Sequence, residues 1–239
     1  MIDVDWVYKT VLLVLNKEQR GYLTPDEFNK IGTQVQLEIF EKYFEDLNQQ
    51  LRVPEAMAQK DSEYGDRIKS LEEKIQIFKT STGLTGSNPF SLASTAPVLH
   101  RIGSLELQPS NLTPVELQRC TRHEYNEINR SKLTRPTSTW PVYVEENDQF
   151  YVYPSDISDG IQLYYIRKPE DIIWNYGIGT NYGEYIFTTT GSQNFEISSI
   201  DQTEVILNIL TYAGLVIRDP QIIQTAAQMA AAENITEKS

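Results

Sequence analysis

Apolar residues near the start of the chain recur at steps of three and four positions, which is the spacing of one face of an α-helix. One run covers residues 4–15, and a longer one begins at Pro25 and continues to about Asn48. The two stripes consist of Val4, Val7, Tyr8, Val11, Leu12 and Leu15, and of Phe28, Ile31, Val35, Ile39, Tyr43 and Leu47. We expect two amphipathic helices joined as a hairpin.

A third helical pattern runs from Ser62 to Lys79, with apolar residues in a 4-3-4-3 order. The members of this seam are Tyr64, Ile68, Leu71, Ile75 and Phe78. A seam of this spacing packs against another helix. The partner is either the helical hairpin of the same chain, the interpretation that we prefer, or a neighbouring subunit, and the seam is therefore a candidate interface.

The helical pattern stops at residues 80–97, where thirteen of eighteen residues are Ser, Thr, Gly, Asn or Pro. This composition predicts a loop or an arm that reaches a neighbouring subunit. A short strand is expected at residues 98–107. The sequence Thr113-Pro114-Val115-Glu116 then has the pattern of a helix N-terminus, and it predicts a helix that continues to about Arg130.

Between residues 142 and 165 apolar residues alternate with other residues, which is the period of a half-buried strand. The alternating positions are Val142, Val144, Phe150, Val152, Ile161, Leu163 and Tyr165, and the stretches EEND and SDISDG separate them as turns. We expect a three-stranded antiparallel meander. A further strand pair is expected at residues 184–189 and 194–197.

The tail returns to helical spacing. Ser199 and Gln202 have the spacing of a capping box before a helix that is expected to reach Gly214. A last helix is expected to begin near Asp219 and Pro220. Its apolar side is small, and its members Ile222, Ile223 and Ala226 are a candidate interface.

These elements predict an α+β fold with an N-terminal helical hairpin or bundle, a central antiparallel sheet and C-terminal helices. The expected divisions are a helical part at residues 1–79, a linker or arm at 80–97, a mixed domain at 98–198 and a helical tail at 199–239. The chain has 239 residues, of which 40% are apolar, so it is long enough for one sizeable core or two small ones.

Composition excludes several classes of function. A single cysteine and two histidines cannot assemble a zinc cluster or an internal disulfide. The sequence contains no apolar run of membrane-spanning length and no signal-peptide pattern, so we expect neither a membrane partner nor export. The net charge of −12 repels phosphate, which argues against tight binding of nucleic acid but allows a surface past which DNA slides.

The stretch NKEQRGYLTPDEF, residues 16–28, resembles the twelve-residue calcium loop of an EF-hand, with Gly21 at the turn and Glu27 at the bidentate position. Calcium needs oxygen ligands early in this loop, but Arg20 places a cation at the fifth position. Thr24 and Glu27 have capping-box spacing, so we interpret the stretch as a turn between helices. A degenerate EF-hand-like calcium-binding module is an alternative.

Three other patterns suggest catalysis, and each lacks an essential part. His123-Glu124 begins the HExxH zinc-protease motif, but Glu127 stands where the second histidine belongs. Cys120 lies three residues from His123, which is a frequent coincidence on one helix. The turn acids Asp156 and Asp159 lie among many tyrosines, which leaves a carbohydrate-binding or carbohydrate-hydrolysing protein as a second alternative. We expect no enzyme activity and no cofactor.

Longer stretches of the sequence resemble virion structural proteins of tailed bacteriophages, including crAss-like and related phages. They are FNKIGTQVQLEIFEKYFEDLN, LTRPTSTWPVYVEENDQFYVYP followed by LYYIRKPEDIIW, and FEIS with EVILNILTYAGLVIRDPQIIQTA. The middle pattern, in which a proline-led strand and an acidic turn precede strands ending in Tyr-Pro and Arg-Lys-Pro, is similar to the adaptor proteins beneath the portal of short-tailed phages. The resemblance covers nearly the whole chain.

This resemblance implies a ring component of the head-to-tail connector, at the portal vertex of the virion, assembled in the cytoplasm of a bacterial host. The implied partners are further copies of the chain, in a ring of twelve, the portal protein, other connector or tail rings, and genomic DNA that passes without specific binding. The acidic β part is expected to face or flank the DNA channel, because a negative wall repels the duplex.

Overall fold

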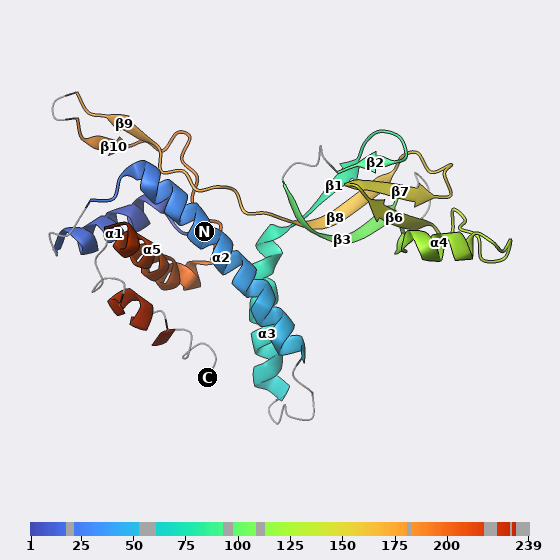
Figure 1. Ribbon diagram of the computed structural model, residues 1–239, viewed down its shortest axis with the longest axis horizontal. Helices are drawn as coiled ribbons and strands as arrows, with labels where there is room; N and C mark the ends of the chain where they lie inside the picture. The colour runs from blue at the N-terminus through green and yellow to red at the C-terminus, as the bar shows by residue number, and fades with distance from the viewer. Residues whose placement is uncertain are drawn as a thin grey trace. The chain divides into compact units, whose positions relative to one another are not determined.

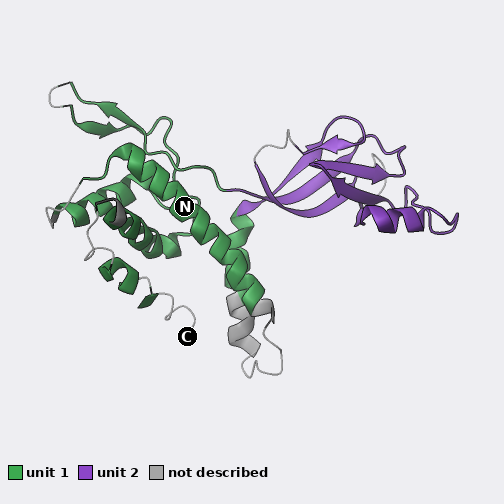
Figure 2. Cartoon of the chain, in the orientation of Figure 1, with its two compact units in different colours: residues 1–77, 169–239 green, residues 78–168 purple. Residues whose placement is uncertain are grey.

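The computed structural model describes residues 1–17, 22–52, 61–92, 98–108, 113–180, 183–217, 224–229 and 231–232 (Figure 1). The chain forms two compact units (Figure 2). Unit 1 contains residues 1–77 and 169–239, and unit 2 contains residues 78–168, so unit 2 is an insertion between two halves of unit 1. The α+β fold class is confirmed, whereas the expected domain boundary at residue 198 is replaced by one at residue 168.

Unit 1 is mainly helical. Its helices are α1 (Val4–Lys17), α2 (Pro25–Arg52), α3 (Asp61–Ile75) with the 3₁₀ turn η2 (Gln76–Phe78), which runs into unit 2, and η3 (Ser199–Asp201) followed by α5 (Gln202–Ile217). Helix α2 packs against α3 and α5, and α5 also packs against α1. Residues 224–229 are helical as well. The helices predicted in the first third of the chain are confirmed, and α2 continues one turn beyond the expected end.

The apolar stripes predicted for α1 and α2 form the core of unit 1. Val4, Val7, Val11, Leu15 and Phe28 are fully buried. Of the expected members Ile31 and Leu47 are only half-buried, while Phe40 and Phe44, which the stripe omitted, are buried with their rings edge to face. The helix therefore buries a wider face than a single heptad seam, as expected for a helix with neighbours on two sides.

The capping box that begins α2 is present. The Thr24 N–H and hydroxyl both donate to Glu27 Oε2, at 2.9 Å and 2.7 Å, and the Glu27 N–H donates to Thr24 Oγ1 at 3.3 Å. These bonds satisfy N–H groups that the first turn of a helix leaves without partners. Leu23 is fully buried beside the cap and its carbonyl accepts from the Tyr8 hydroxyl, which fixes the start of α2 against α1.

Polar side chains on α2 explain why residues 169–196 belong to unit 1. The Trp174 N–H donates to Asn29 Oδ1 at 2.8 Å, and the Ile172 N–H donates to Thr33 Oγ1 at 3.2 Å. Gln36, one turn further along, donates to a backbone carbonyl and accepts from a backbone N–H of the same segment. Spacings of four and three residues place these side chains on one helix face, where they hold an irregular segment in place of a strand partner.

Unit 1 also contains a two-stranded sheet of β9 (Tyr176–Ile178) and β10 (Tyr185–Phe187). The expected pairing of residues 184–189 with 194–197 is wrong, because β10 pairs with the preceding strand across the glycine-rich turn. Phe195 instead forms an isolated antiparallel bridge with Ile2, and both residues are buried. The burial of Ile2 and Phe195 determined where Phe195 pairs, whereas the prediction rested only on the local alternation of apolar residues.

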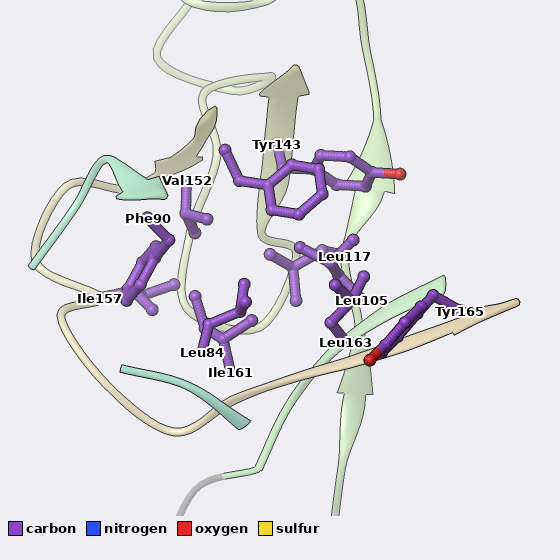
Figure 3. Close-up of a cluster of buried hydrophobic side chains, with 11 residues drawn as sticks. Leu84, Phe90, Leu105, Leu117, Tyr143, Val152, Ile157, Ile161, Leu163 and Tyr165 are labelled. Atoms are coloured by element: carbon purple, nitrogen blue, oxygen red, sulfur yellow. The ribbon is translucent and has the colours of Figure 1, made fainter. Parts of the chain in front are cut away.

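Unit 2 consists of two four-stranded sheets. The first has the order β1 (Lys79–Leu84), β8 (Ile161–Arg167), β3 (Leu99–Leu107), β4 (Val115–Glu116), and the second has the order β2 (Phe90–Ser91), β7 (Gln149–Tyr153), β6 (Val142–Glu146), β5 (Gln118–Arg119). Residues from both sheets form one buried cluster that includes Leu105, Phe150, Val152 and Leu163 (Figure 3).

The predicted meander is correct only for its first hairpin. Strands β6 and β7 pair antiparallel around Asn147 and Asp148, which both have positive φ, as a tight hairpin turn requires. Strand β8 leaves this sheet and pairs with β3 and β1 in the other one. Alternation correctly identified the buried face of each strand, but it carries no information on which strands are neighbours.

The expected arm at residues 80–97 is wrong for its described part. Lys79–Leu84 pairs along β8, and Phe90 pairs with Phe150. Residues 93–97 lie outside the described residues. Threonine has a high strand propensity and an edge strand needs few apolar residues, so pairing with β8 and burial of Leu84 and Phe90 overrode the loop-like composition.

The helix expected from Thr113 begins eight residues later, as α4 (Arg122–Ile128). Thr121 and Glu124 form its capping box, so the pattern Thr-x-x-Glu was correct in kind but was assigned to the wrong threonine. The intervening residues are extended, since the Leu117 N–H donates to the Leu105 carbonyl and the Cys120 N–H donates to the Tyr143 carbonyl.

Similarly, Ser198 rather than Ser199 caps η3, and α5 continues past Gly214 to Ile217.

Candidate functional site

Unit 2 contains a groove of about 1130 Å³. We call it the β4–β5 groove, because strands β4 and β5 form its floor between β3 on one side and the loop after α4 on the other. Both β4 and β5 are the last strands of their sheets. The groove is therefore lined by two strand edges as well as by side chains.

Hydrogen bonds at the start of α4 fix this helix, which leads into the loop that lines the groove. Arg122 donates to both carboxylate oxygens of Glu146, at 2.9 Å and 2.6 Å, and to the Tyr153 hydroxyl at 2.8 Å. The Tyr125 and Tyr153 rings stack with centroids 3.9 Å apart. The pKa of Arg122 is raised by these hydrogen bonds and the pKa of Glu146 is lowered by the one from Arg122, so the pair is charged. The helix is thus fixed to β6 and β7.

The loop after α4 carries exposed apolar and basic side chains. Leu133 is 97% exposed and Trp140 is 78% exposed, and both line the β4–β5 groove. Arg130, Lys132 and Arg135 are exposed, and within the described part of the chain they form no ion pair. Arg135 lines the groove together with Arg119, which pairs with Glu145 at 2.9 Å. The groove lining accordingly combines exposed apolar side chains with two arginines and the acid Glu116.

Charge is distributed unevenly between the units. Unit 2 contains nine lysines and arginines and nine aspartates and glutamates, so the whole net charge of −12 belongs to unit 1. The expectation that the outer surface of the β-rich part is strongly negative is therefore wrong. It combined acids of both units, and Glu196, Asp201 and Glu204 among them are buried.

A buried charged cluster in unit 1 joins three elements. Asp201 of η3 accepts hydrogen bonds from the Tyr43 hydroxyl of α2 and from Lys74 Nζ of α3, the latter at 2.8 Å. Lys42 Nζ binds Glu204 Oε1 at 2.8 Å one turn away. Burial, followed by the negative charge of Asp201, raises the pKa of Tyr43, which keeps the phenol protonated as a donor. The cluster joins α2, α3 and η3, so we assign it a structural role.

The predicted interface seam on α3 is mostly used inside the chain. Ile75 and Phe78 are buried, and Ile68 and Leu71 are half-buried in a helix that packs against α2. Packing within the chain, the interpretation preferred from the sequence, accounts for these four residues. The side chain of Tyr64 lies outside the described residues, as do Ile222 and Ile223, whereas Ala226 is buried.

The residues singled out for chemistry are dispersed or occupied. The Glu27 carboxylate, which an EF-hand loop would use as its bidentate ligand, accepts hydrogen bonds from the N–H and the hydroxyl of Thr24. Cys120 is buried with its pKa raised chiefly by burial, and its thiol is 3.5 Å from the Tyr143 carbonyl. His123 is exposed beside Glu127, 3.4 Å from Nε2 to Oε1.

The carbohydrate alternative finds no assembled platform among the described side chains. Asp156 and Asp159 are exposed in the turn after β7. The aromatic residues of this part of the sequence are divided between the two units. Tyr143 and Tyr165 lie in the core of unit 2, and Trp174 is buried in unit 1. No group of three or more His, Cys, Asp or Glu side chains that could hold a metal ion occurs among the described residues.

Sequence reasoning missed the β4–β5 groove. One indication was available, because residues 119–135 hold five lysines and arginines in a strongly acidic chain. The expected helix from Thr113 concealed it, since a helix there would have removed the strand edges that form the floor.

No protein-family model matches the chain, and no curated protein is similar to it. None of the described helices is long and apolar enough to cross a membrane.

Proposed function

We propose that this chain is a structural subunit of a ring in the head-to-tail connector of a tailed bacteriophage, an adaptor beneath the portal that forms part of the DNA conduit. The sequence resemblance to phage adaptor proteins suggests the assignment. Copies of the chain, in a ring of twelve, are its first partners, followed by the portal protein and the next connector or tail ring. The chain then resides at the portal vertex of the virion.

The observation that carries the proposal is the presence of exposed apolar groups at three separate places. On α1, Trp6 and Leu13 share a face opposite the buried stripe, and Val14 is exposed at the edge of the stripe. On the β9–β10 hairpin, Ile178, Tyr185 and Ile186 are exposed, and on the groove rim so are Leu133 and Trp140. Single exposed apolar residues are ordinary, but groups of them mark interaction surfaces.

A ring subunit needs such groups at more than one place. Each copy in a ring contacts two neighbours through two different surfaces, because the contact is heterologous. A subunit between a portal and a tail needs further contacts above and below. Three apolar surfaces on two units fit this requirement better than they fit an enzyme, which requires one concave site.

The charge distribution supports a place beside DNA. Unit 1 carries the net charge of −12, and a negative surface repels a passing duplex and prevents it from sticking. We therefore infer that unit 1 flanks the channel, in place of the β-rich part that the sequence suggested. Passage of DNA without specific binding follows from the same repulsion.

The test is electron microscopy of the phage particle, with symmetry analysis at the portal vertex. We expect density for a closed ring between portal and tail into which both units fit, repeated twelve times. Absence of the chain from the particle, or its location on the capsid faces or in a fibre, would refute the proposal. A different copy number in a closed ring would correct only the symmetry.

A further inference from the structure

The β9–β10 hairpin presents apolar side chains that unit 1 does not cover. At its base, the Tyr176 and Phe187 rings lie 5.8 Å and 5.7 Å from the Trp174 ring, which anchors the hairpin. Beyond the base, Ile178 is 70% exposed, and Tyr185, its partner on the opposite strand, is exposed on the same face. An isolated two-stranded sheet is marginally stable in water, so this hairpin gains from a further partner.

The hairpin also has one charge and open edges. Glu184 is the single ionisable acid between Tyr176 and Phe187, and no lysine or arginine accompanies it. It is exposed, and its carboxylate lies over Gly179, where a Cβ would be 2.4 Å from Oε1. Strands β9 and β10 pair only with each other among the described strands. The surface offered is an apolar strand pair with an acidic residue.

The β4–β5 groove has the complementary properties. Its lining is apolar at the exposed Leu133 and Trp140 and cationic at Arg135, and it also contains the exposed acid Glu116 on β4. Its floor contains two terminal strands of the sheets, and a strand edge is the ordinary docking place for an added strand. The groove therefore suits an extended, apolar and acidic segment.

We propose that the β9–β10 hairpin of one copy docks in the β4–β5 groove of unit 2 of the next copy. The inference rests on the ring proposed above and names the contact between its neighbours. Glu184 of one copy faces Arg135 of the other, and Ile178 packs against Leu133 and Trp140. Because the two surfaces differ, the contact is heterologous, and repetition of it generates a ring or a filament.

Charge favours this occupant over nucleic acid. A nucleic acid entering the groove would meet two cations, Arg119, which is already paired with Glu145, and Arg135, together with the exposed acid Glu116, and would approach a chain with a net charge of −12. The hairpin needs one opposite charge at the rim and supplies apolar area for the rest. Burial of apolar side chains dominates protein association, and ion pairs at a rim mainly set specificity.

Disulfide trapping tests the contact. Two variants of the full chain with one added cysteine each, Ile178→Cys and Leu133→Cys, are mixed at about millimolar concentration and oxidised with copper phenanthroline. Cys120 is buried and remains in both. We expect a covalent heterodimer from the mixture and little from either variant alone. The matched control replaces Ile178→Cys by Ile200→Cys, which is 75% exposed on η3 of the same unit.

Charge exchange provides an independent readout of the same contact. By sedimentation velocity, Arg135→Glu and Glu184→Arg should each weaken self-association about fivefold, the scale of one ion pair at a rim. The double variant should regain the parental value, because the pair is restored with its signs reversed. Lys132→Glu, an exposed cation outside the groove lining, is the control and should change association less.

The outcomes distinguish failure of the proposed contact from failure of the proposed ring. Equal trapping of Ile178→Cys and Ile200→Cys, or no rescue by the double variant, in a chain that does self-associate, would overturn the contact and leave the ring standing. No self-association at millimolar concentration would also overturn it, since the contact needs only this chain. The ring would then depend on a portal template and on the microscopy described above.

Discussion

Individual residues show how closely local chemistry determines this fold. Thr24 with Glu27 and Thr121 with Glu124 form the same capping box in different units, and both are present in the described structure. The buried cluster of Tyr43, Lys74 and Asp201 was not predicted, since its members are far apart in sequence. A local pattern is visible in a sequence, whereas a tertiary ion pair is not.

Loss of the first cap should have a defined cost. Thr24→Ala removes the hydroxyl that binds the Glu27 N–H and should lower the free energy of unfolding by about 1 kcal/mol. Thr10→Ala is the matched control, because the Thr10 hydroxyl donates to a carbonyl within α1 on an exposed face. Urea unfolding followed by circular dichroism measures both. Equal stability of the two variants would contradict the role of the cap.

Removal of one partner from the buried cluster should cost more. Lys74→Met leaves the carboxylate of Asp201 buried without its cation and should destabilise unit 1 by about 3 kcal/mol. Lys69→Met, at an exposed position of the same helix, should change stability by less than about 0.5 kcal/mol. Urea midpoints compare the two. A similar small effect for both would show that Asp201 does not require Lys74.

At the scale of elements, prediction succeeded where the spacing of apolar residues determines the element, and it failed where pairing with a distant strand determines it. Helices α1, α2 and α3 follow from apolar spacing, and hairpin β6–β7 follows from alternation and its turn. Strand β1 could not be recognised, because its residues become a strand only through pairing with β8. The β4–β5 groove depends on such pairings, so the sequence shows only its cluster of cations and not the groove itself.

Strand β3 contains a test of close pairing. A Cβ at Gly103 would lie 2.9 Å from the Tyr164 carbonyl oxygen, at an irregular register between β3 and β8. Gly103→Ala should therefore separate the strands and destabilise unit 2 by about 1–3 kcal/mol. At Gly83, on β1 of the same sheet, the nearest atom is 3.6 Å away, so Gly83→Ala should be nearly neutral. Hydrogen exchange of β8 amides measures both, and equal exchange would contradict this reasoning.

At the scale of the whole molecule, the separation of charge is the main property that the sequence count concealed. A net charge of −12 describes unit 1, whereas unit 2 is neutral and carries a basic loop. The boundary at residues 77 and 169 had to be known before charges could be assigned, because sequence order does not follow spatial division here. The two units therefore have different electrostatic roles.

The charge separation predicts weak interaction with DNA. The full chain should not retard duplex DNA in a gel at physiological salt, because the field of unit 1 outweighs the exposed cations Arg130, Lys132 and Arg135 around the loop after α4. Arg135→Glu should behave identically. Retardation that this substitution abolishes would make the β4–β5 groove a nucleic-acid site and would contradict the hairpin as its occupant.

The chain enters unit 2 through β1 and leaves it through β8, and these two strands are neighbours in one sheet. Unit 2 can therefore be removed or exchanged as one piece. Lys79 at the start of β1 is the Cα partner of Ile166 near the end of β8, and antiparallel partners are about 5 Å apart. A short glycine linker from Ile77 to Pro169 should therefore span the ends left by deletion of residues 78–168. We expect the shortened chain to keep the helical circular dichroism of unit 1. Transplanted units with other grooves could then alter which copies recognise each other while the helical frame stays the same.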